Sequence, residues 1–129
     1  MFQEVFPILS TADLPRALRF YQDLLGFKVT YRFPPEGQGE PDYVGLKLDQ
    51  SELGIGMDPA LDGEAVAPGS PAARRFALCV YTEDCDAAVE RLRAAGTTVL
   101  SEPIDQPWGE RMAEVADPDG NRLVLLARL

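Results

Sequence analysis

The residues available for chemistry in this chain are limited first by an absence, because none of its 129 residues is a histidine. That excludes Ser–His–Asp and Cys–His nucleophiles, and it excludes every metal site built on histidine. The two cysteines, Cys79 and Cys85, cannot complete a zinc site alone, and we expect them to be reduced thiols. Any acid–base chemistry must therefore use aspartate, glutamate, lysine, tyrosine or cysteine.

Aromatic residues near irregular segments are the second group with functional potential. Trp108 is the single tryptophan and lies in a segment rich in proline and glycine, where it either stacks on a ligand or fixes the loop to the core. Phe33 precedes the loop predicted at 34–41 and is a further candidate for stacking. Tyr43 shares a predicted strand face with Gly45 and would offer a ring and a hydroxyl. These residues favour contact with a planar or aromatic small molecule.

The charge balance narrows the class of partner. The chain has 12 basic and 21 acidic residues, a net charge of −9, which argues against nucleic-acid binding and mildly favours a cationic ligand. No apolar run reaches the length of a membrane span, and the first residues lack a basic signal-peptide region. We therefore expect a cytoplasmic protein that contacts neither nucleic acid nor membrane.

The elements that must position these side chains occur in the same order in both halves of the chain. By hydrophobic spacing, the first half is predicted to hold a strand in 4–10, a helix with apolar positions from Leu14 to Leu25, and strands in 27–33, 43–48 and 53–57. The second half is predicted to hold a strand in 75–82, a helix in 84–95, and strands in 98–102, 111–116 and 122–128. Each half therefore reads strand–helix–strand–strand–strand.

Two glycines in equivalent places support a duplicated module. Gly26 and Gly96 each follow a predicted helix and lie 70 residues apart. We predict a single α+β domain over 1–129, with one module in about 1–57, a linker in 58–73 and a second module in about 74–129. Neither half is large enough to fold stably alone, so we expect the modules to pair within the chain or with a second chain, as a homodimer.

Three segments resemble the vicinal-oxygen-chelate superfamily of glyoxalases, bleomycin resistance proteins and extradiol dioxygenases. They are DLPRALRFYQDLLGF (13–27), CVYTEDCDAAVERLRAAG (79–96) and PWGERMAEVADPDGNRLVLL (107–126). The resemblance implies two βαβββ modules whose curved mixed sheets surround a concave cavity, with the helices on the convex side. It is specific for the fold and not for the function, which varies widely in this superfamily.

The same resemblance assigns faces to the strands. The residues implied to face a helix are Phe76, Leu78, Val80, Leu123 and Leu125. Those implied to line the cavity are Arg75, Ala77, Cys79, Val124 and Leu126. Three glycines also fall on the cavity face, namely Gly45, Gly54 and Gly56, where they either leave room for a ligand or permit sheet twist.

Metalloenzymes of this superfamily carry metal ligands at four cavity-facing strand positions, which fall here at Phe6, Lys47, Arg75 and Val124. Phenylalanine and valine have no donor atom, and lysine and arginine are cations that repel a divalent metal. The resemblance therefore implies neither a catalytic metal nor another cofactor, and it disfavours metal-dependent glyoxalase or dioxygenase activity. The bleomycin-resistance-like branch is the nearest match.

Charged residues in the second half have open roles. Arg75 in a cavity would need a partner, either Glu114 or an oxyanion of the ligand, and otherwise it is solvated at the end of the linker. Arg111 and Glu114 lie on opposite faces of one predicted strand, so only one of them points inward.

We expect a protein that binds and sequesters an antibiotic-like, aromatic or cationic small molecule, more in the manner of a binding protein than of an enzyme. The expected ligand contacts are Phe6, Phe33, Tyr43, Lys47, Arg75, Trp108, Arg111, Glu114 and Val124. One alternative is a metal-independent lyase or isomerase acting on a small carbonyl compound, with Glu114 or Tyr43 moving a proton. Another is a partner subunit or regulatory domain without a ligand of its own.

Overall fold

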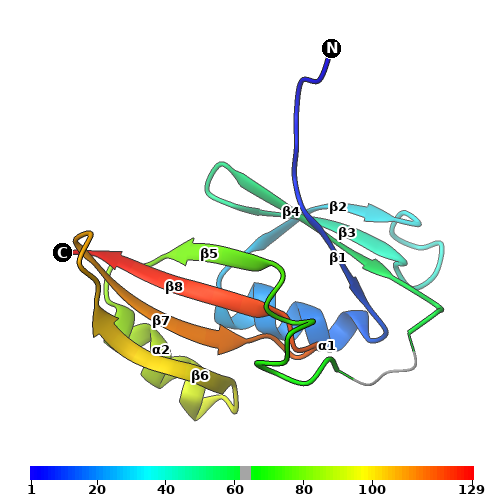
Figure 1. The fold of residues 1–129 in the computed structure, drawn as a ribbon. Coiled ribbons are helices and arrows are strands. Elements are labelled where there is room, and N and C mark those ends of the chain that lie inside the picture. The colour runs from blue at the N-terminus through cyan, green and yellow to red at the C-terminus, as the bar shows by residue number, and fades with distance from the viewer. Residues whose placement is uncertain (62–64) are drawn as a thin grey trace. The chain divides into compact units, whose positions relative to one another are not determined.

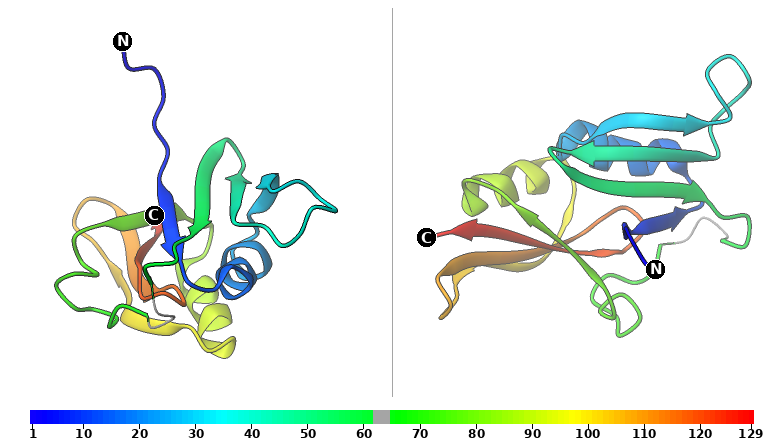
Figure 2. Two further views of the ribbon diagram at one scale, coloured as in Figure 1. Left: turned by 90° about the vertical axis from the view of Figure 1, so that its right-hand side faces the viewer. Right: turned by 90° about the horizontal axis from the view of Figure 1, so that it is seen from above.

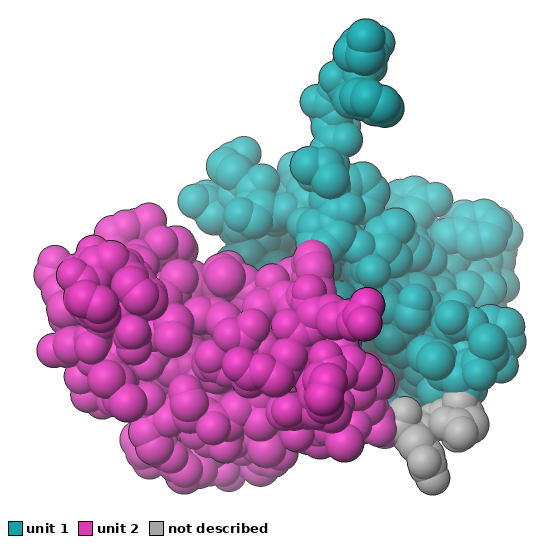
Figure 3. Space-filling view, in the orientation of Figure 1, with its two compact units in different colours: residues 1–64 teal, residues 65–129 magenta. Residues whose placement is uncertain are grey.

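A computed structural model describes residues 1–61 and 65–129; Asp62, Gly63 and Glu64, part of the linker expected at 58–73, lie outside the described residues. The chain divides into two compact units, residues 1–64 and 65–129 (Figure 3). Each unit contains one four-stranded mixed sheet and one helical segment, as the duplicated strand–helix–strand–strand–strand pattern predicts. The α+β class with two βαβββ modules is confirmed.

Unit 1 is built from β1 (Ile8–Thr11), α1 (Leu14–Leu18), a π-helical turn (Arg19–Leu24), β2 (Lys28–Phe33), β3 (Tyr43–Leu48) and β4 (Ser51–Met57). The strand order is β1-β4-β3-β2, with β1 parallel to β4 and the other pairs antiparallel (Figure 1). Its apolar core joins the helical segment to one face of the sheet. The buried residues include Leu14, Ala17, Phe20, Tyr21, Val44, Leu46, Leu53 and Ile55.

The local sequence explains where the first helix begins and how it ends. The Asp13 carboxylate caps the helix by accepting a hydrogen bond from the Arg16 amide at 3.0 Å. The second half of the predicted helix is π-helical, with the Leu25 amide bonded to the Phe20 carbonyl. Gly26 follows with φ of +86°, a conformation that favours glycine.

The first strand is shorter than the predicted 4–10, since pairing with β4 starts only at Ile8. Residues 1–6 continue away from the sheet as an extended arm, in which Met1, Phe2 and Val5 are almost completely exposed (Figure 1). Pro7 stands at this boundary: its carbonyl accepts a hydrogen bond from the Gly54 amide at 2.9 Å, but its nitrogen has no hydrogen to donate to β4.

Unit 2 repeats this architecture with β5 (Ala77–Tyr81), α2 (Cys85–Ala94), β6 (Thr98–Asp105), β7 (Glu110–Ala116) and β8 (Arg122–Arg128). The strand order is β5-β8-β7-β6, again with the first strand parallel to the last (Figure 2). Asp84 caps α2 through the Ala87 amide at 3.0 Å. The buried face of α2 packs on the sheet, and the core includes Cys85, Val89, Leu92, Ala113, Val115, Leu123 and Leu125.

In unit 2 the structure supports the face assignment for β8, whereas Phe76 and Arg75 lie before β5. Leu123 and Leu125 are 0% and 2% exposed on the side that carries α2. Phe76, expected to face a helix, is 59% exposed because β5 begins only at Ala77. Arg75 also precedes the strand, so strand alternation fixes the direction of neither side chain. Within the described residues, no helix is long and apolar enough to cross a membrane.

Candidate functional site

A pocket of about 300 Å³ lies in unit 1. It is lined by Phe6, Tyr31, Tyr43, Gly45, Leu46, Glu52 and Leu53. Tyr43 and Gly45 project from β3 on the face of the sheet away from its own helix, here called the open face, because Val44 and Leu46 alternate with them and are buried. The pocket therefore combines aromatic rings and glycine backbone with a single carboxylate.

The two tyrosines of the pocket form one aromatic wall. The ring centroids of Tyr31 and Tyr43 are 6.1 Å apart at an interplanar angle of 63°, an edge-on arrangement. Tyr31 comes from β2, directly after an irregularity in the β2–β3 register between Val29 and Tyr31, and pairs with Gly45. A Cβ atom added to Gly45 would lie 3.3 Å from Tyr31 Cβ, so the absence of a side chain at Gly45 lets Tyr31 lie close against β3, and both residues line the pocket.

An ion pair lies at the edge of this pocket. Lys47 Nζ is 3.5 Å from the Glu52 carboxylate, and the two residues face each other across the β3–β4 hairpin. Of these two residues, Glu52 lines the pocket and Lys47 does not. Both side chains are about half exposed, so the pair contributes little to stability and leaves the carboxylate accessible.

The structure separates the expected contacts of the first half into two groups. Phe6 and Tyr43 line the pocket, Phe6 from the arm just before β1. Phe33 stands at the end of β2, 54% exposed and outside the lining, and Lys47 is held in the ion pair.

The open face of unit 2 carries a buried carboxylate. Glu114 is 8% exposed and accepts two hydrogen bonds from Arg122, at 2.9 and 3.1 Å, while Arg74 Nη1 lies 3.8 Å away. Hydrogen bonding to Arg122 is the main cause that lowers the pKa of Glu114, with a further contribution from the charge of Arg74. Glu114 is therefore held as a carboxylate and is poorly suited to donate a proton.

Arg75 does not pair with Glu114, which was one of the partners expected for it. The cations around Glu114 are Arg122 and Arg74, and Arg75 is exposed with no ion pair among the described residues. Val124 pairs with Glu114 across β7 and β8 and is 6% exposed on the same face.

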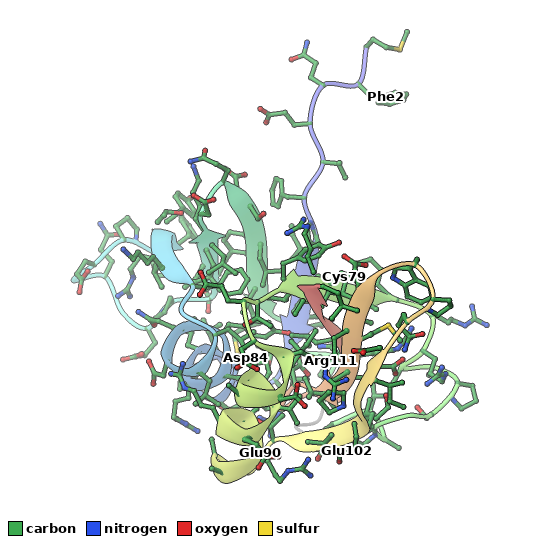
Figure 4. The ribbon with its side chains drawn as sticks, turned by 90° about the vertical axis from the view of Figure 1, so that its left-hand side faces the viewer. Phe2, Cys79, Asp84, Glu90, Glu102 and Arg111 are labelled. Atoms are coloured by element: carbon green, nitrogen blue, oxygen red, sulfur yellow. The ribbon has the colours of Figure 1, made fainter. Side chains whose placement is uncertain are left out.

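Arg111 belongs to the opposite face. Its guanidinium donates hydrogen bonds to Asp86 of α2, at 2.7 and 3.0 Å, and to Asp105 of β6 at 2.9 Å. Figure 4 labels Arg111, which lies beside α2. The same contact with Arg111 lowers the pKa of Asp86. Of the two residues expected on opposite faces of this strand, Glu114 is thus the one on the open face, and Arg111 ties the helix to the sheet.

Trp108 belongs to a cluster at one end of unit 2. Its indole N–H donates to the Glu110 carboxylate at 2.9 Å, and the Tyr81 phenol is bonded to the same carboxylate, which raises the pKa of Tyr81. The Arg128 guanidinium stacks 3.9 Å from the centroid of the Tyr81 ring. Trp108 remains 60% exposed, so its ring is oriented by a hydrogen bond and is not buried as a loop anchor.

The residues at the four positions where the resemblance would place metal ligands do not suit a divalent metal. Phe6, Lys47, Arg75 and Val124 offer no neutral or anionic donor. Across residues 1–61 and 65–129, no group of three or more histidine, cysteine, aspartate or glutamate side chains is placed to hold a metal ion. No step of a mechanism is therefore assigned to a metal.

Several residues of these sites were not expected from the sequence, among them Tyr31, Glu52 and Arg122. Glu52 could have been found by extending the hairpin register until it faced Lys47. Tyr31 follows the register irregularity of β2, which strand alternation does not reveal. Arg122 could have been found because it lies two residues before Val124 and so shares its face.

Comparison with known proteins gives a consistent result. A family model described as the Glyoxalase/Bleomycin resistance protein/Dioxygenase superfamily matches residues 5–125. A Mycobacterium tuberculosis protein named "Putative glyoxylase CFP32" is 32% identical over 104 residues, which are 81% of this chain and 36% of that protein. The chain thus spans about a third of the length of that curated relative.

Two solved structures are similar over almost the whole chain. A glyoxalase-related enzyme from Fulvimarina pelagi has a TM-score of 0.72 and 26% identity, covering 98% of this chain and 89% of that one. A bleomycin resistance determinant encoded on transposon Tn5 has a TM-score of 0.65 and 24% identity, covering 98% of both chains. The second likeness shows the fold alone.

Proposed function

The chain belongs to the Glyoxalase/Bleomycin resistance protein/Dioxygenase superfamily, and from this premise we propose that it binds and sequesters an antibiotic-like small molecule, aromatic or cationic, without a catalytic metal. The observation that carries the proposal is the pocket of unit 1, with its aromatic wall and one accessible carboxylate. Rings favour a planar aromatic group, and the carboxylate of Glu52 favours a positive charge beside it.

The pocket residues supply binding and orientation. Tyr31 and Tyr43 present their rings at an angle, so a planar ligand can stack on one and meet the edge of the other. Gly45 lets the ligand approach the backbone of β3 closely. A ligand cation would compete with Lys47 for Glu52, and because that ion pair is half exposed, its replacement costs little.

The test uses proflavine, a planar tricyclic cation whose fluorescence responds to stacking. We expect saturable binding at one site per chain and about tenfold weaker binding by the variant Tyr31→Ala, which removes half of the aromatic wall. The matched control is Tyr81→Ala, which removes an exposed tyrosine from unit 2 without changing the net charge. It should bind like the parent.

Equal loss of affinity in both variants would show that proflavine adheres to the acidic surface and would refute the pocket as its site. Absence of saturable binding at physiological salt would refute aromatic binding altogether, since stacking in a pocket is only weakly screened.

The second candidate function is a metal-independent lyase or isomerase acting on a small carbonyl compound, and one observation favours Tyr43 over Glu114 as its proton-moving group. Tyr43 lines the pocket and its hydroxyl has no hydrogen-bond partner among the described residues, whereas the Glu114 carboxylate is paired with Arg122 and Arg74. Turnover of the hemithioacetal of methylglyoxal and glutathione, abolished in Tyr43→Phe and retained in Glu114→Gln, would establish this function in place of sequestration.

We further propose that the protein acts as a cytoplasmic homodimer. The described structure contains free thiols at exposed Cys79 and buried Cys85, which accords with a reducing compartment. Native mass spectrometry of the untagged protein tests the assembly, because a dimer mass supports it and a monomer at micromolar concentration refutes it. The same spectrum would reveal a co-purified small molecule.

A further inference from the structure

Two of the three glycines on the open face of unit 1, Gly54 and Gly56, are covered by one side chain of the protein itself. A Cβ atom added to Gly54 would lie 2.2 Å from the Tyr43 hydroxyl oxygen and 2.9 Å from its ring carbon Cζ. At Gly56 the added atom would lie 3.5 Å from the Tyr43 ring. The Tyr43 ring therefore crosses from β3 and lies directly over the backbone of β4.

Gly54 is required here for space and not for backbone conformation. Neither Gly54 nor Gly56 has a positive φ, so alanine can adopt the backbone conformation of either position. The obstacle at Gly54 is the far end of a tyrosine side chain. Gly54 is buried because the Tyr43 ring occupies the place that a side chain would fill.

The Tyr43 ring is held in this place by weak contacts. No hydrogen bond fixes its hydroxyl among the described residues, and its aromatic neighbour is Tyr31, edge-on at 6.1 Å. Such an edge contact is worth about 1 kcal/mol, and a rotamer change of a partly exposed side chain is fast. The ring can therefore leave Gly54 without disturbing the β3–β4 ladder.

We propose that Tyr43 sets the size of the ligand that the pocket accepts. With its ring over Gly54, Tyr43 closes the pocket at about 300 Å³, the lower limit for sites that take drug-sized molecules. When the ring moves away, the backbone of Gly54 and Gly56 becomes a flat floor that continues the pocket along β4. The preferred ligands are then single-ring aromatics with Tyr43 in place and fused polycyclic aromatics with Tyr43 displaced. This inference rests on the proposed aromatic binding.

The test compares two neutral probes, p-cresol with one ring and acridine with three fused rings, so that charge does not affect the outcome. In Tyr43→Ala we expect about fivefold weaker binding of p-cresol, which loses its wall, and about fivefold tighter binding of acridine, which no longer displaces a ring. Tyr43→Phe should restore the parent's preference, because it restores the ring. Tyr81→Ala in unit 2 is the control.

A second variant displaces the Tyr43 ring from Gly54 without removing the tyrosine. Gly54→Ala places a methyl group where the Tyr43 ring lies, so the ring must turn away, and the preference should move toward acridine as in Tyr43→Ala. This variant keeps the test decisive if Tyr43→Ala fails to fold.

The results distinguish a Tyr43 ring that selects ligands by size from one that only covers glycines of the sheet. Opposite changes for the two probes support the selecting role, which a purely structural side chain would not produce. If both affinities fall together in Tyr43→Ala and Gly54→Ala, the ring only covers glycines in the sheet and the inference is wrong, although aromatic binding stands. If the parent binds neither probe nor proflavine, the proposed function itself fails.

Discussion

The open faces of the two units carry different chemistry on the same strand order. In unit 1 the central strands present Gly45, Gly54 and Gly56, and the space is shared between aromatic rings and a pocket. In unit 2 the equivalent central strands present Glu114 and Arg122, which fill the face with a buried ion pair. Both sheets have the first strand parallel to the last, so topology does not cause the difference.

This comparison separates what the fold provides from what the side chains add. Each βαβββ unit offers a sheet with one face on its helix and one face free for function. Where small residues occupy the centre of that face, a hollow remains for a ligand. Where a long acidic and a long basic residue meet, the face is filled and becomes part of the stability of the unit. The comparison therefore predicts binding effects in unit 1 and stability effects in unit 2.

The largest expected effect is on the ion pair of unit 2. Glu114→Ala leaves Arg122, whose side chain is 21% exposed, without its main partner and should lower the free energy of unfolding by about 3 kcal/mol. The matched change in unit 1, Glu52→Ala, breaks a half-exposed pair and should cost less than about 0.5 kcal/mol. Urea unfolding measures both, and similar losses would remove the distinction between the two faces.

The glycines of the two units give the next largest contrast. Gly120 has φ of +88°, and a Cβ there would lie 1.9 Å from the Val66 carbonyl oxygen, so Gly120→Ala should cost about 2 kcal/mol. Gly54→Ala meets only the movable Tyr43 ring and should cost less than about 1 kcal/mol. Thermal unfolding compares the pair. A Gly54→Ala protein as unstable as Gly120→Ala would show that the Tyr43 ring cannot move.

A smaller effect should appear in the response of stability to acid. Arg122 lowers the pKa of Glu114 in the folded protein, so the unfolded chain takes up a proton at a higher pH than the folded one. The resulting stability is present above the unfolded carboxyl pKa of about 4.3 and is lost as the pH falls through the folded pKa. Unfolding free energies measured from neutral to acidic pH should therefore decline less steeply in Glu114→Gln. If unfolding free energy depends on pH in the same way in the parent and in Glu114→Gln, Glu114 does not contribute to the acid sensitivity of the fold.

The smallest effect concerns the cluster of Trp108 in unit 2. The Glu110 carboxylate raises the pKa of the Tyr81 phenol by accepting its hydrogen bond and also holds the Trp108 indole. In Glu110→Gln, tyrosinate absorbance should appear at lower pH, and the emission of the single tryptophan should shift while the fold is retained. An unchanged titration would mean that the phenol is not bonded to Glu110 in solution.

Much of the fold could be predicted because its signals are local. The caps Asp13 and Asp84 and the glycines Gly26 and Gly96 lie within one turn of the helix ends that they define. Strand ends were less predictable. β1 and β5 begin later than their apolar runs because pairing with a neighbouring strand, and not local propensity, decides where a strand starts.

The candidate site was predictable only in part. Strand alternation identified Tyr43 on the open face, and the structure places it and Phe6 in the pocket lining. It could not identify the partner of Glu114, since Arg74, Arg75 and Arg122 are all plausible cations and the choice depends on register across β5, β8 and β7. Arg111 was equally undecided until its contacts with Asp86 and Asp105 appeared.

The sequence by itself determined the duplicated order of elements, the acidic charge and the absence of histidine chemistry, because these depend on composition and on spacing within a few residues. Only the tertiary structure decided that Tyr43 covers Gly54, that Arg122 neutralises Glu114 and that Arg111 belongs to the helix face. Those contacts join residues on different strands or on a strand and a helix, and their geometry is set by sheet register and packing, which no local pattern records.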